Sequence, residues 1–448
     1  MRLVSLPMFQ PAPPRAAATT APPWFHLIER DRPLAFVVGA SRLFEIDPAL
    51  ADRLQAGDHD ALDALRAFHA PRGDQPHDTA APVALSLNVA QACNLACDYC
   101  YADEGRFGGA PRQMGDDLAL RAIDRLIDGA AGRRVTIGFI GGEPFLHRSL
   151  IHRCVRYASA RAAAAAVPVG FSVATNATLL RDDDLELLRS HEFAVSVSID
   201  GDAAIHDHHR PRRDGGGSHA RVLAAIAPLL AAPGKARVAA RATITRDDLR
   251  VTERLTALLD AGFLEAGVSP ARTAPDPRLV FRADDWPRFL AEMTRAATGE
   301  LARLRATRAA AFGFSNLAIA LKQIHRGACR ALPCGAGQSY VSLGADGHYY
   351  TCHRTIGLPA FELGSLEHGP AEHKRSRFLA ARDVDAQEPC RTCWARYLCG
   401  GGCHAEVTAA GRDGCDYIRG WLELCLAIYS DLVDERPDLF PAPTGATP

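Results

Sequence analysis

The sequence has almost no charge imbalance and no long hydrophobic run. Its 51 Lys and Arg against 52 Asp and Glu give a net charge of −1, so no long-range field draws the chain toward nucleic acid or an acidic membrane. The first ten residues lack the charged segment and apolar run of a signal peptide. The longest alanine run, 162–166, is far too short to span a bilayer. We therefore expect a cytoplasmic protein that binds neither nucleic acid nor membrane.

Cysteine, by contrast, is abundant. The number of cysteines, 13, is odd, and without a secretion signal a disulfide framework is not expected. Ten of them fall into two ordered groups, the first being Cys93, Cys97 and Cys100 and the second being Cys334, Cys352, Cys390, Cys393, Cys399, Cys403 and Cys415. Three thiolates can hold three irons of a [4Fe–4S] cube and leave the fourth open, whereas a zinc loop needs a fourth protein ligand. The second group has enough thiolates for two further clusters.

The ends of the chain and the first ordered unit differ in composition from the rest. Residues 1–23 and 437–448 are rich in proline, and we expect both to be disordered. Between them, residues 24–72 predict a small unit with strands at 25–28, 34–38 and 43–46. Asp47 and Pro48 then have the residue types that begin a helix. A polar stretch at 71–82 links this unit to the rest of the chain.

The middle of the chain predicts an α/β fold. Apolar runs alternate with helical patterns over 83–272, which indicates βα units and a parallel sheet. Strands are expected at 84–89, 135–140, 169–174, 194–199, 238–244 and 265–268. Six such units form a partial (β/α)6 barrel that is open on one side. A helical linker is expected at 273–328 and a cysteine-rich domain at 329–436, in which 341–352 predicts a β-hairpin around Asp346 and Gly347.

The first cysteine group directly follows the first barrel strand. It therefore belongs to a loop at the end of the barrel where active sites of βα barrels lie. Tyr99, directly before Cys100, suits a cofactor packed beside the cluster. With these features the chain resembles the radical S-adenosylmethionine (SAM) enzymes. The resemblance implies that the methionine part of SAM chelates the open iron and that reduction releases a 5′-deoxyadenosyl radical, which abstracts a hydrogen atom.

Further family-like motifs end the next barrel strands. Gly141, Gly142, Glu143 and Pro144 end the second, Asn176 the third, and Ser198 and Asp200 the fourth, with Arg210 shortly after. The resemblance implies that these residues bind SAM, with Ser198 and Arg210 at its carboxylate and ribose. The alternative is that Ser198 is a core hydroxyl and Arg210 a surface charge. We expect His206, His208 and His209 to be solvated loop histidines rather than a metal site, and Cys154 to be a core thiol.

The second cysteine group resembles the SPASM extension of peptide-modifying radical SAM enzymes. That resemblance implies two auxiliary [4Fe–4S] clusters, three in all with the first. One would be held by Cys334, Cys352 and Cys403, with Cys329 as a possible fourth ligand, unless the open iron accepts a substrate cysteine. The other would be held by Cys390, Cys393, Cys399 and a last cysteine, for which we prefer Cys415 to Cys425. A zinc ribbon is the alternative, although ribbons rarely use seven cysteines.

Sulfatase maturases resemble this chain over the barrel but place an acidic residue after the second extension cysteine. Here that residue is His353, a candidate catalytic group. Residues 102–109, 393–397, 400–404 and 414–416 more closely resemble maturases that form thioether crosslinks, in which the N-terminal unit recognises a leader peptide. We expect a ribosomal peptide or protein substrate and a reducing partner such as flavodoxin or ferredoxin. An electron-transfer protein, sulfatase-maturase-like oxidation and small-molecule radical chemistry remain alternatives.

Overall fold

The computed structural model describes residues 22–70, 72, 80–307 and 309–440. Its centre is one sheet with the strand order β12-β11-β10-β4-β5-β6-β7-β8-β9. The six strands from β4 to β9 are parallel, and they lie within one or two residues of the predicted strands: β4 (Ala84–Ala90), β5 (Val135–Gly141), β6 (Val169–Thr175), β7 (Phe193–Ser198), β8 (Arg237–Ile244) and β9 (Ala266–Pro270). The predicted α/β partial barrel is confirmed.

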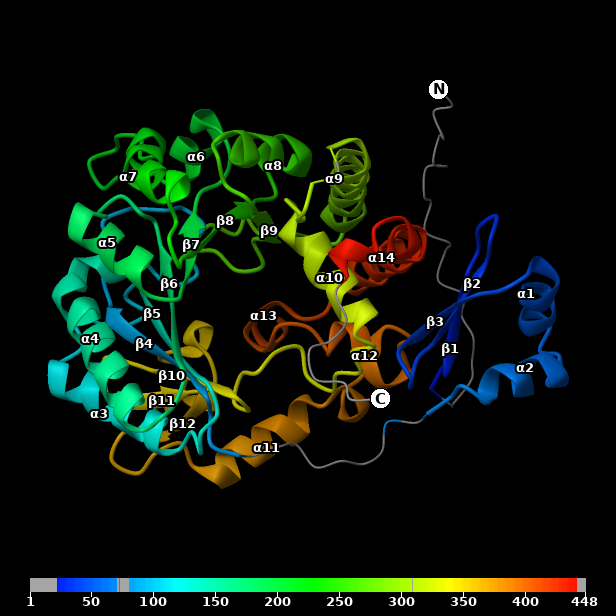
Figure 1. Ribbon diagram of the computed structural model, residues 1–448, viewed down its shortest axis with the longest axis horizontal. Helices are drawn as coiled ribbons and strands as arrows, with labels where there is room; N and C mark the ends of the chain where they lie inside the picture. Colours follow the sequence, from blue (N-terminus) through cyan, green and yellow to red (C-terminus); the bar gives the residue numbers. More distant parts are fainter. Residues whose placement is uncertain (1–21, 71, 73–79, 308, 441–448) are drawn as a thin grey trace.

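Helices cover the outer face of the parallel strands (Figure 1). They are α3 (Asp116–Asp128), α4 (Arg148–Ala164), α5 (Asp182–Ser190), α6 (Ala203–His209), α7 (His219–Ala231) and α8 (Val251–Asp260). Phe139, Phe171 and Phe193 belong to the core on this side. Because side chains alternate along a strand, the neighbouring Gly138 and Ser172 face inward. A Cβ on Gly138 would meet the Ser172 hydroxyl at 2.9 Å, so the concave face carries small side chains.

The cysteine-rich region extends the barrel sheet, which the sequence did not predict. β10 (Tyr340–Leu343) pairs in parallel with β4, and β11 (His348–Tyr350) and β12 (Glu362–Ser365) continue the sheet in antiparallel fashion. β10 and β11 form the predicted hairpin, in which Gly347 has a φ of +85°. Two cysteines of the second group, Cys334 and Cys352, flank this hairpin and are therefore fixed relative to the barrel.

Helices join the barrel to the N-terminal unit. α9 (Asp285–Thr307) and α10 (Ser315–His325) occupy the predicted linker, and both pack on α14 (Cys415–Glu435). The short helices α11 (Glu372–Arg382), α12 (Arg396–Cys399) and α13 (His404–Ala410) complete this region. The expectation that the chain is disordered from residue 437 onward is wrong for residues 437–440, because Phe440 is buried against Phe312 and Tyr429. Most of the two segments expected to be disordered, 1–21 and 441–448, lies outside the described residues.

The N-terminal unit has an antiparallel sheet of β1 (Phe25–Ile28), β2 (Leu34–Val37) and β3 (Arg42–Glu45), with β2 in the middle. α1 (Pro48–Gln55) begins as predicted, since the Asp47 carboxylate accepts the Leu50 N–H at 2.8 Å. A second helix, α2 (His59–Arg66), follows it. One sheet face packs on these helices, whereas Phe36 on the other face packs against Trp394 of the cysteine-rich region. The unit therefore shares a core with the rest of the molecule.

None of the helices in the described ranges is both long enough and apolar enough to span a membrane.

Candidate active site and cysteine clusters

The cysteine loop lies at the carboxyl end of β4, where its three thiols come close together. Burial raises the pKa of Cys93 to about 11 and that of Cys97 to about 12, and the thiol of Cys100 is a near neighbour of both. In the chain alone the thiols of Cys93 and Cys97 would therefore stay protonated at neutral pH. A group that supplies positive charge, as iron does, would stabilise them as thiolates. The loop thus fits an iron–sulfur cluster.

The GGEP segment holds the end of β5 against this loop. A Cβ on Gly141 would meet the Ala90 carbonyl oxygen at 2.3 Å, and one on Gly142 would meet that of Ala92 at 2.3 Å, so only glycine fits at either position. The main-chain N–H of Glu143 donates to the same Ala92 oxygen at 2.9 Å. Pro144 begins the short turn 144–147 that leads into α4.

The Glu143 side chain is fully buried and points back into the protein. Its carboxylate accepts hydrogen bonds from Thr175 Oγ1 at 2.8 Å and from the main-chain N–H groups of Asn176 and Phe145 at 2.7 and 3.0 Å. Burial raises the pKa of this carboxyl to about 7, despite these three donors. In this structure Glu143 therefore joins the ends of β5 and β6. Contact of the GGEP segment with SAM remains a proposal.

Asp200, just after β7, is the centre of a second buried network. Its carboxylate accepts from the Tyr99 hydroxyl, from Arg210 Nε at 3.0 Å and from the Thr243 N–H at 2.9 Å. Arg210 Nη1 lies 4.0 Å from Cys97 Sγ, and its guanidinium lies 5.2 Å from the Tyr99 ring centre. Arg210 is only 8% exposed, so it is not a surface charge. The network brings three of the predicted SAM-binding residues to the second cysteine. Ser198, which ends β7, is partly buried.

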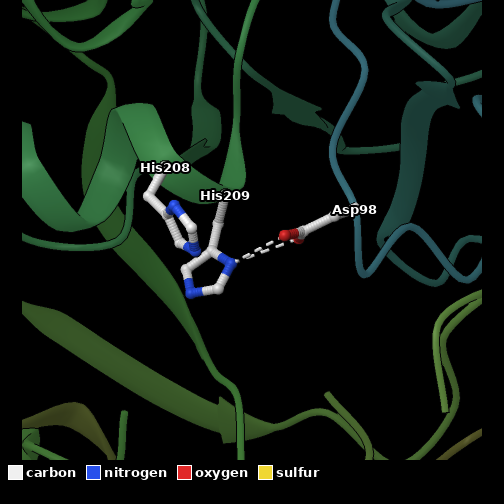
Figure 2. Close-up of side chains that lie close together, drawn as sticks. All are labelled: Asp98, His208 and His209. Atoms are coloured by element: carbon white, nitrogen blue, oxygen red, sulfur yellow. Dashed lines mark hydrogen bonds and ion pairs between the residues drawn. The ribbon is translucent and has the colours of Figure 1, made fainter. Parts of the chain in front are cut away.

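An ion pair holds the cysteine loop from α6. His209 Nδ1 lies 2.9 Å from the Asp98 carboxylate, and Figure 2 shows Asp98 facing His209 with His208 beside them. Ligand atoms of the three residues lie within 4.8 Å of one another. However, His209 already has partners at both nitrogens, since its Nε2 lies 3.1 Å from Thr245 Oγ1. We therefore interpret the group as an ion pair.

The expectation of solvated loop histidines is wrong for two of the three. His206 and His209 are buried on α6, and only His208 is exposed. His206 accepts the Asp200 N–H at 3.3 Å, and its other nitrogen lies 2.9 Å from Ser218 Oγ. Burial lowers the pKa of His206 to about 4, so this ring is neutral and structural. The short polar segment around it reads as a loop in sequence, but it forms a helix with one buried face.

Cys334, Cys352 and Cys403 form a second thiol set near the barrel. Burial, together with the smaller effects of the nearby Cys403 and Cys334 thiols, raises the pKa of Cys352 to about 12. Cys329 is turned elsewhere, because its thiol contacts the Gly39 carbonyl oxygen of the N-terminal unit at 3.5 Å. The structure therefore brings together the three predicted ligands but not their possible fourth.

Tyr101 lies between this set and the cysteine loop of the barrel. The Tyr101 residue is 45% exposed, but desolvation of its hydroxyl raises the pKa of that group to about 12, and the thiols of Cys352, Cys100 and Cys403 contribute in the same direction. The guanidinium of Arg354 lies 4.7 Å from the Tyr101 ring centre and pairs with Glu406 at 2.8 Å. Sequence reasoning missed this link, because its three side chains come from separate segments.

The remaining cysteines of the second group surround a cavity of about 250 Å³. Its lining includes Cys390, Cys393, Cys399 and Cys415, together with Cys403. Cys425 is fully buried inside α14 and does not line this cavity. Cys154, on α4, is likewise a core thiol. The cavity and its thiols fit a second auxiliary cluster with Cys415 as the last ligand.

Comparison with known proteins decides the chemical class of the barrel. Residues 87–262 match the Radical SAM superfamily. The chain contains a radical SAM domain. The family uses a [4Fe–4S] cluster and SAM, and the thiols at the barrel mouth suit that cluster. Among curated proteins, the radical SAM enzyme is 27% identical to the serine-type anaerobic sulfatase-maturating enzyme of Klebsiella aerogenes over 380 residues, which cover 78% of this chain and 86% of the relative.

Other relatives share parts of the chain or its fold. The sporulation killing factor maturation protein SkfB of Bacillus subtilis is 30% identical over 140 residues, or 31% of each chain. Native anSMEcpe with bound AdoMet superposes with a TM-score of 0.67 at 17% identity, covering 79% of this radical SAM enzyme and 100% of that chain. Streptococcus suis SuiB bound to precursor peptide SuiA superposes at 0.52 with 13% identity, covering 87% and 96%. These structures share its fold.

Proposed function

We propose that this radical SAM enzyme is a maturase that joins a cysteine sulfur of a ribosomal peptide or protein to a carbon atom by a thioether. The observation that carries the proposal is the position of Tyr101. Its neighbours include Cys100 of the barrel loop and both Cys352 and Cys403 of the second thiol set. A substrate held beside Tyr101 would therefore lie close to both sets. Relatives that mature peptides or proteins, SkfB and the sulfatase-maturating enzyme, support a substrate of this class.

The reaction forms one S–C bond and breaks one S–H and one C–H bond. When bound, SAM and the barrel cluster supply the radical that removes the hydrogen atom from carbon, and a cluster on Cys334, Cys352 and Cys403 supplies an acceptor for the surplus electron. The thiol also loses a proton. His353 is our candidate to accept it. The Tyr340 hydroxyl donates its proton to Ser86 Oγ of β4 at 3.0 Å, so His353 Nδ1, 3.0 Å from that hydroxyl, is the donor and His353 Nε2 keeps a lone pair for a proton.

We expect the modified peptide to be lighter than its precursor by two hydrogen atoms per crosslink. The thiol that forms the thioether should no longer react with iodoacetamide. Mass spectrometry of a cysteine-containing candidate peptide, incubated anaerobically with reduced enzyme and SAM, measures both changes. The same peptide with serine in place of cysteine is the matched control and should keep its mass. A product whose thiols all still react with iodoacetamide would contradict thioether formation.

Sulfatase-maturase-like oxidation of a side chain is the second candidate. The 27% identity to the Klebsiella aerogenes enzyme over 78% of this chain favours it. His353 argues against this candidate, because sulfatase maturases have an acidic residue at that position. The serine control and fragmentation of the product separate the two reactions, because oxidation of a serine side chain also removes two hydrogen atoms but creates no link between two residues of the peptide.

The N-terminal unit is our candidate for leader-peptide recognition. β1 and β3 are the two edges of its three-stranded sheet, and strand edges can bind an extended peptide through main-chain hydrogen bonds. A cavity of about 300 Å³ opens between the end of β1 and α1, lined among others by Leu27, Pro33, Asp52 and Gln55. A leader bound here would raise the effective concentration of the linked core peptide at the barrel. We also propose flavodoxin or ferredoxin as the reducing partner.

Filling that cavity should weaken leader binding. In the Gln55→Trp variant the indole would occupy the space beside β1, and we expect the dissociation constant of a fluorescent precursor peptide, measured by anisotropy, to rise about tenfold or more, equivalent to about 1.4 kcal/mol. The Asp63→Trp variant carries the same ring on the exposed face of α2, outside the cavity, and should bind the peptide as tightly as the unmodified enzyme does.

Deleting the whole unit is a poorer test, because the deletion would expose the core around Trp394. Equal affinity in both variants would contradict leader binding at this site.

A further inference from the structure

Three polar side chains form a closed ring beside the first cysteine. Asn176 Nδ2 donates to Asn94 Oδ1 at 3.0 Å, and Asn94 Nδ2 donates to Thr178 Oγ1 at 2.8 Å. Thr178 Oγ1 in turn donates to Asn176 Oδ1 at 2.7 Å. Asn94 belongs to the cysteine loop, whereas Asn176 and Thr178 follow β6. Asn176 and Thr178 are 5% and 3% exposed, so water does not compete for these bonds.

The ring determines which way the Asn176 amide faces. The main-chain N–H of Thr178 donates to Asn176 Oδ1 at 3.0 Å. Because that group can only donate, the atom opposite it must be the amide oxygen. The amide nitrogen therefore faces the cysteine loop, where Nδ2 lies 3.7 Å from Cys93 Sγ. The Asn176 main chain is held as well, since its N–H donates to the buried Glu143 carboxylate at 2.7 Å.

Cys93 Sγ thus receives a side-chain donor in addition to a main-chain one, the Leu95 N–H at 3.4 Å. A [4Fe–4S] cluster gains one negative charge when it is reduced, and hydrogen bonds to its thiolate sulfurs stabilise that charge. A donor that the fold already holds in place does so without reorganising. We propose that Asn176 is a positioning residue that raises the reduction potential of the cluster on Cys93, Cys97 and Cys100. This inference rests on the cluster assignment within the proposed function.

The test is a redox titration of the reconstituted holoenzyme monitored by electron paramagnetic resonance. The signal that shifts when SAM is added identifies the barrel cluster. Asn176→Leu has nearly the same shape, introduces no charge and removes the donor. We expect its barrel cluster to have a lower reduction potential than that of the unmodified enzyme, while the SAM-insensitive signals keep theirs. If the leucine variant does not fold, Asn176→Ser is too short to reach Cys93 and carries the same expectation.

Two further variants separate a direct effect on sulfur from a loss of loop position. Thr178→Val breaks the ring but leaves the Asn176 amide, and it should lower the potential by less than Asn176→Leu does. Gln323→Leu, which removes a side-chain amide from α10, should leave the potential unchanged. An unchanged potential in the Asn176 variants, or an equal decrease in Thr178→Val, would overturn the proposal. Its failure is distinct from failure of the proposed function, because iron content and the crosslinked product are measured separately.

Discussion

Replacing Cys93, Cys97 and Cys100 together by alanine is expected to remove about four of about twelve irons from the reconstituted enzyme, since each cube holds four. It should also abolish reductive cleavage of SAM to 5′-deoxyadenosine and methionine, which we expect in the unmodified enzyme even without peptide. The physical reason is that these three half-buried thiols share one loop at the barrel mouth. Iron analysis and chromatography after dithionite reduction measure the two effects.

Cys154→Ala is the matched control for this variant. Cys154 is fully buried on α4 within the apolar core, so its loss should change neither iron content nor cleavage. Full iron retention in the triple variant would refute the assignment of the barrel cluster. An unmodified enzyme with only about four irons would instead limit the chain to one cluster.

The Asp200→Ala variant is expected to destabilise the enzyme strongly. The Asp200 carboxylate is fully buried and pairs with Arg210, which is 8% exposed, so its removal leaves a buried guanidinium without its counter-charge. The cost of such a broken pair is about 3–5 kcal/mol. Thermal unfolding of the cluster-free chain, compared among variants, measures the loss. Asp214→Ala, which removes an exposed partner of Arg212, is the control and should unfold close to the unmodified chain.

The same pair predicts a dependence on pH. Burial alone would raise the pKa of Asp200, but Arg210 and the Tyr99 hydroxyl hold it below the ordinary value of an aspartate. A lowered folded-state pKa stabilises the fold above the unfolded-state pKa, and this stability is lost as the pH falls through the folded-state pKa. Asp200→Asn should therefore lose less stability on acidification than the unmodified chain does. An equal loss in both would show that other groups control acid unfolding.

Much of the barrel could be predicted because β4 is buried on both faces and the other strands bury residues on at least one face. Such strands leave continuous apolar runs in the sequence, and β4 to β9 begin and end within two residues of those runs. β10 was foreseen only as half of a hairpin. The local sequence of this four-residue strand does not indicate that its second edge pairs in parallel with β4, which lies more than two hundred residues earlier in the chain.

The errors have a common origin in long-range burial. His206 and His209 lie in a short polar segment that reads as a loop, yet Ser218, Asp98 and Thr245 partner them in the interior. Residues 437–440 look like the start of a Pro-rich tail, but Phe440 packs on Tyr429. The N-terminal unit reads as separate because 71–82 is polar. Its sheet nevertheless has a second apolar face, and that face is covered by the cysteine-rich region.

The sequence by itself determined the radical SAM barrel and the presence of two ordered cysteine groups, because strand burial and ligand spacing are local properties of the chain. Only the tertiary structure decided which polar groups hold those cysteines. Asn176 lies 83 residues from Cys93, and Arg210 lies 113 residues from Cys97. Such pairs meet because parallel strands bring their carboxyl ends to one edge of the sheet. Strand order sets which side chain faces which sulfur, and it is a property of the whole fold.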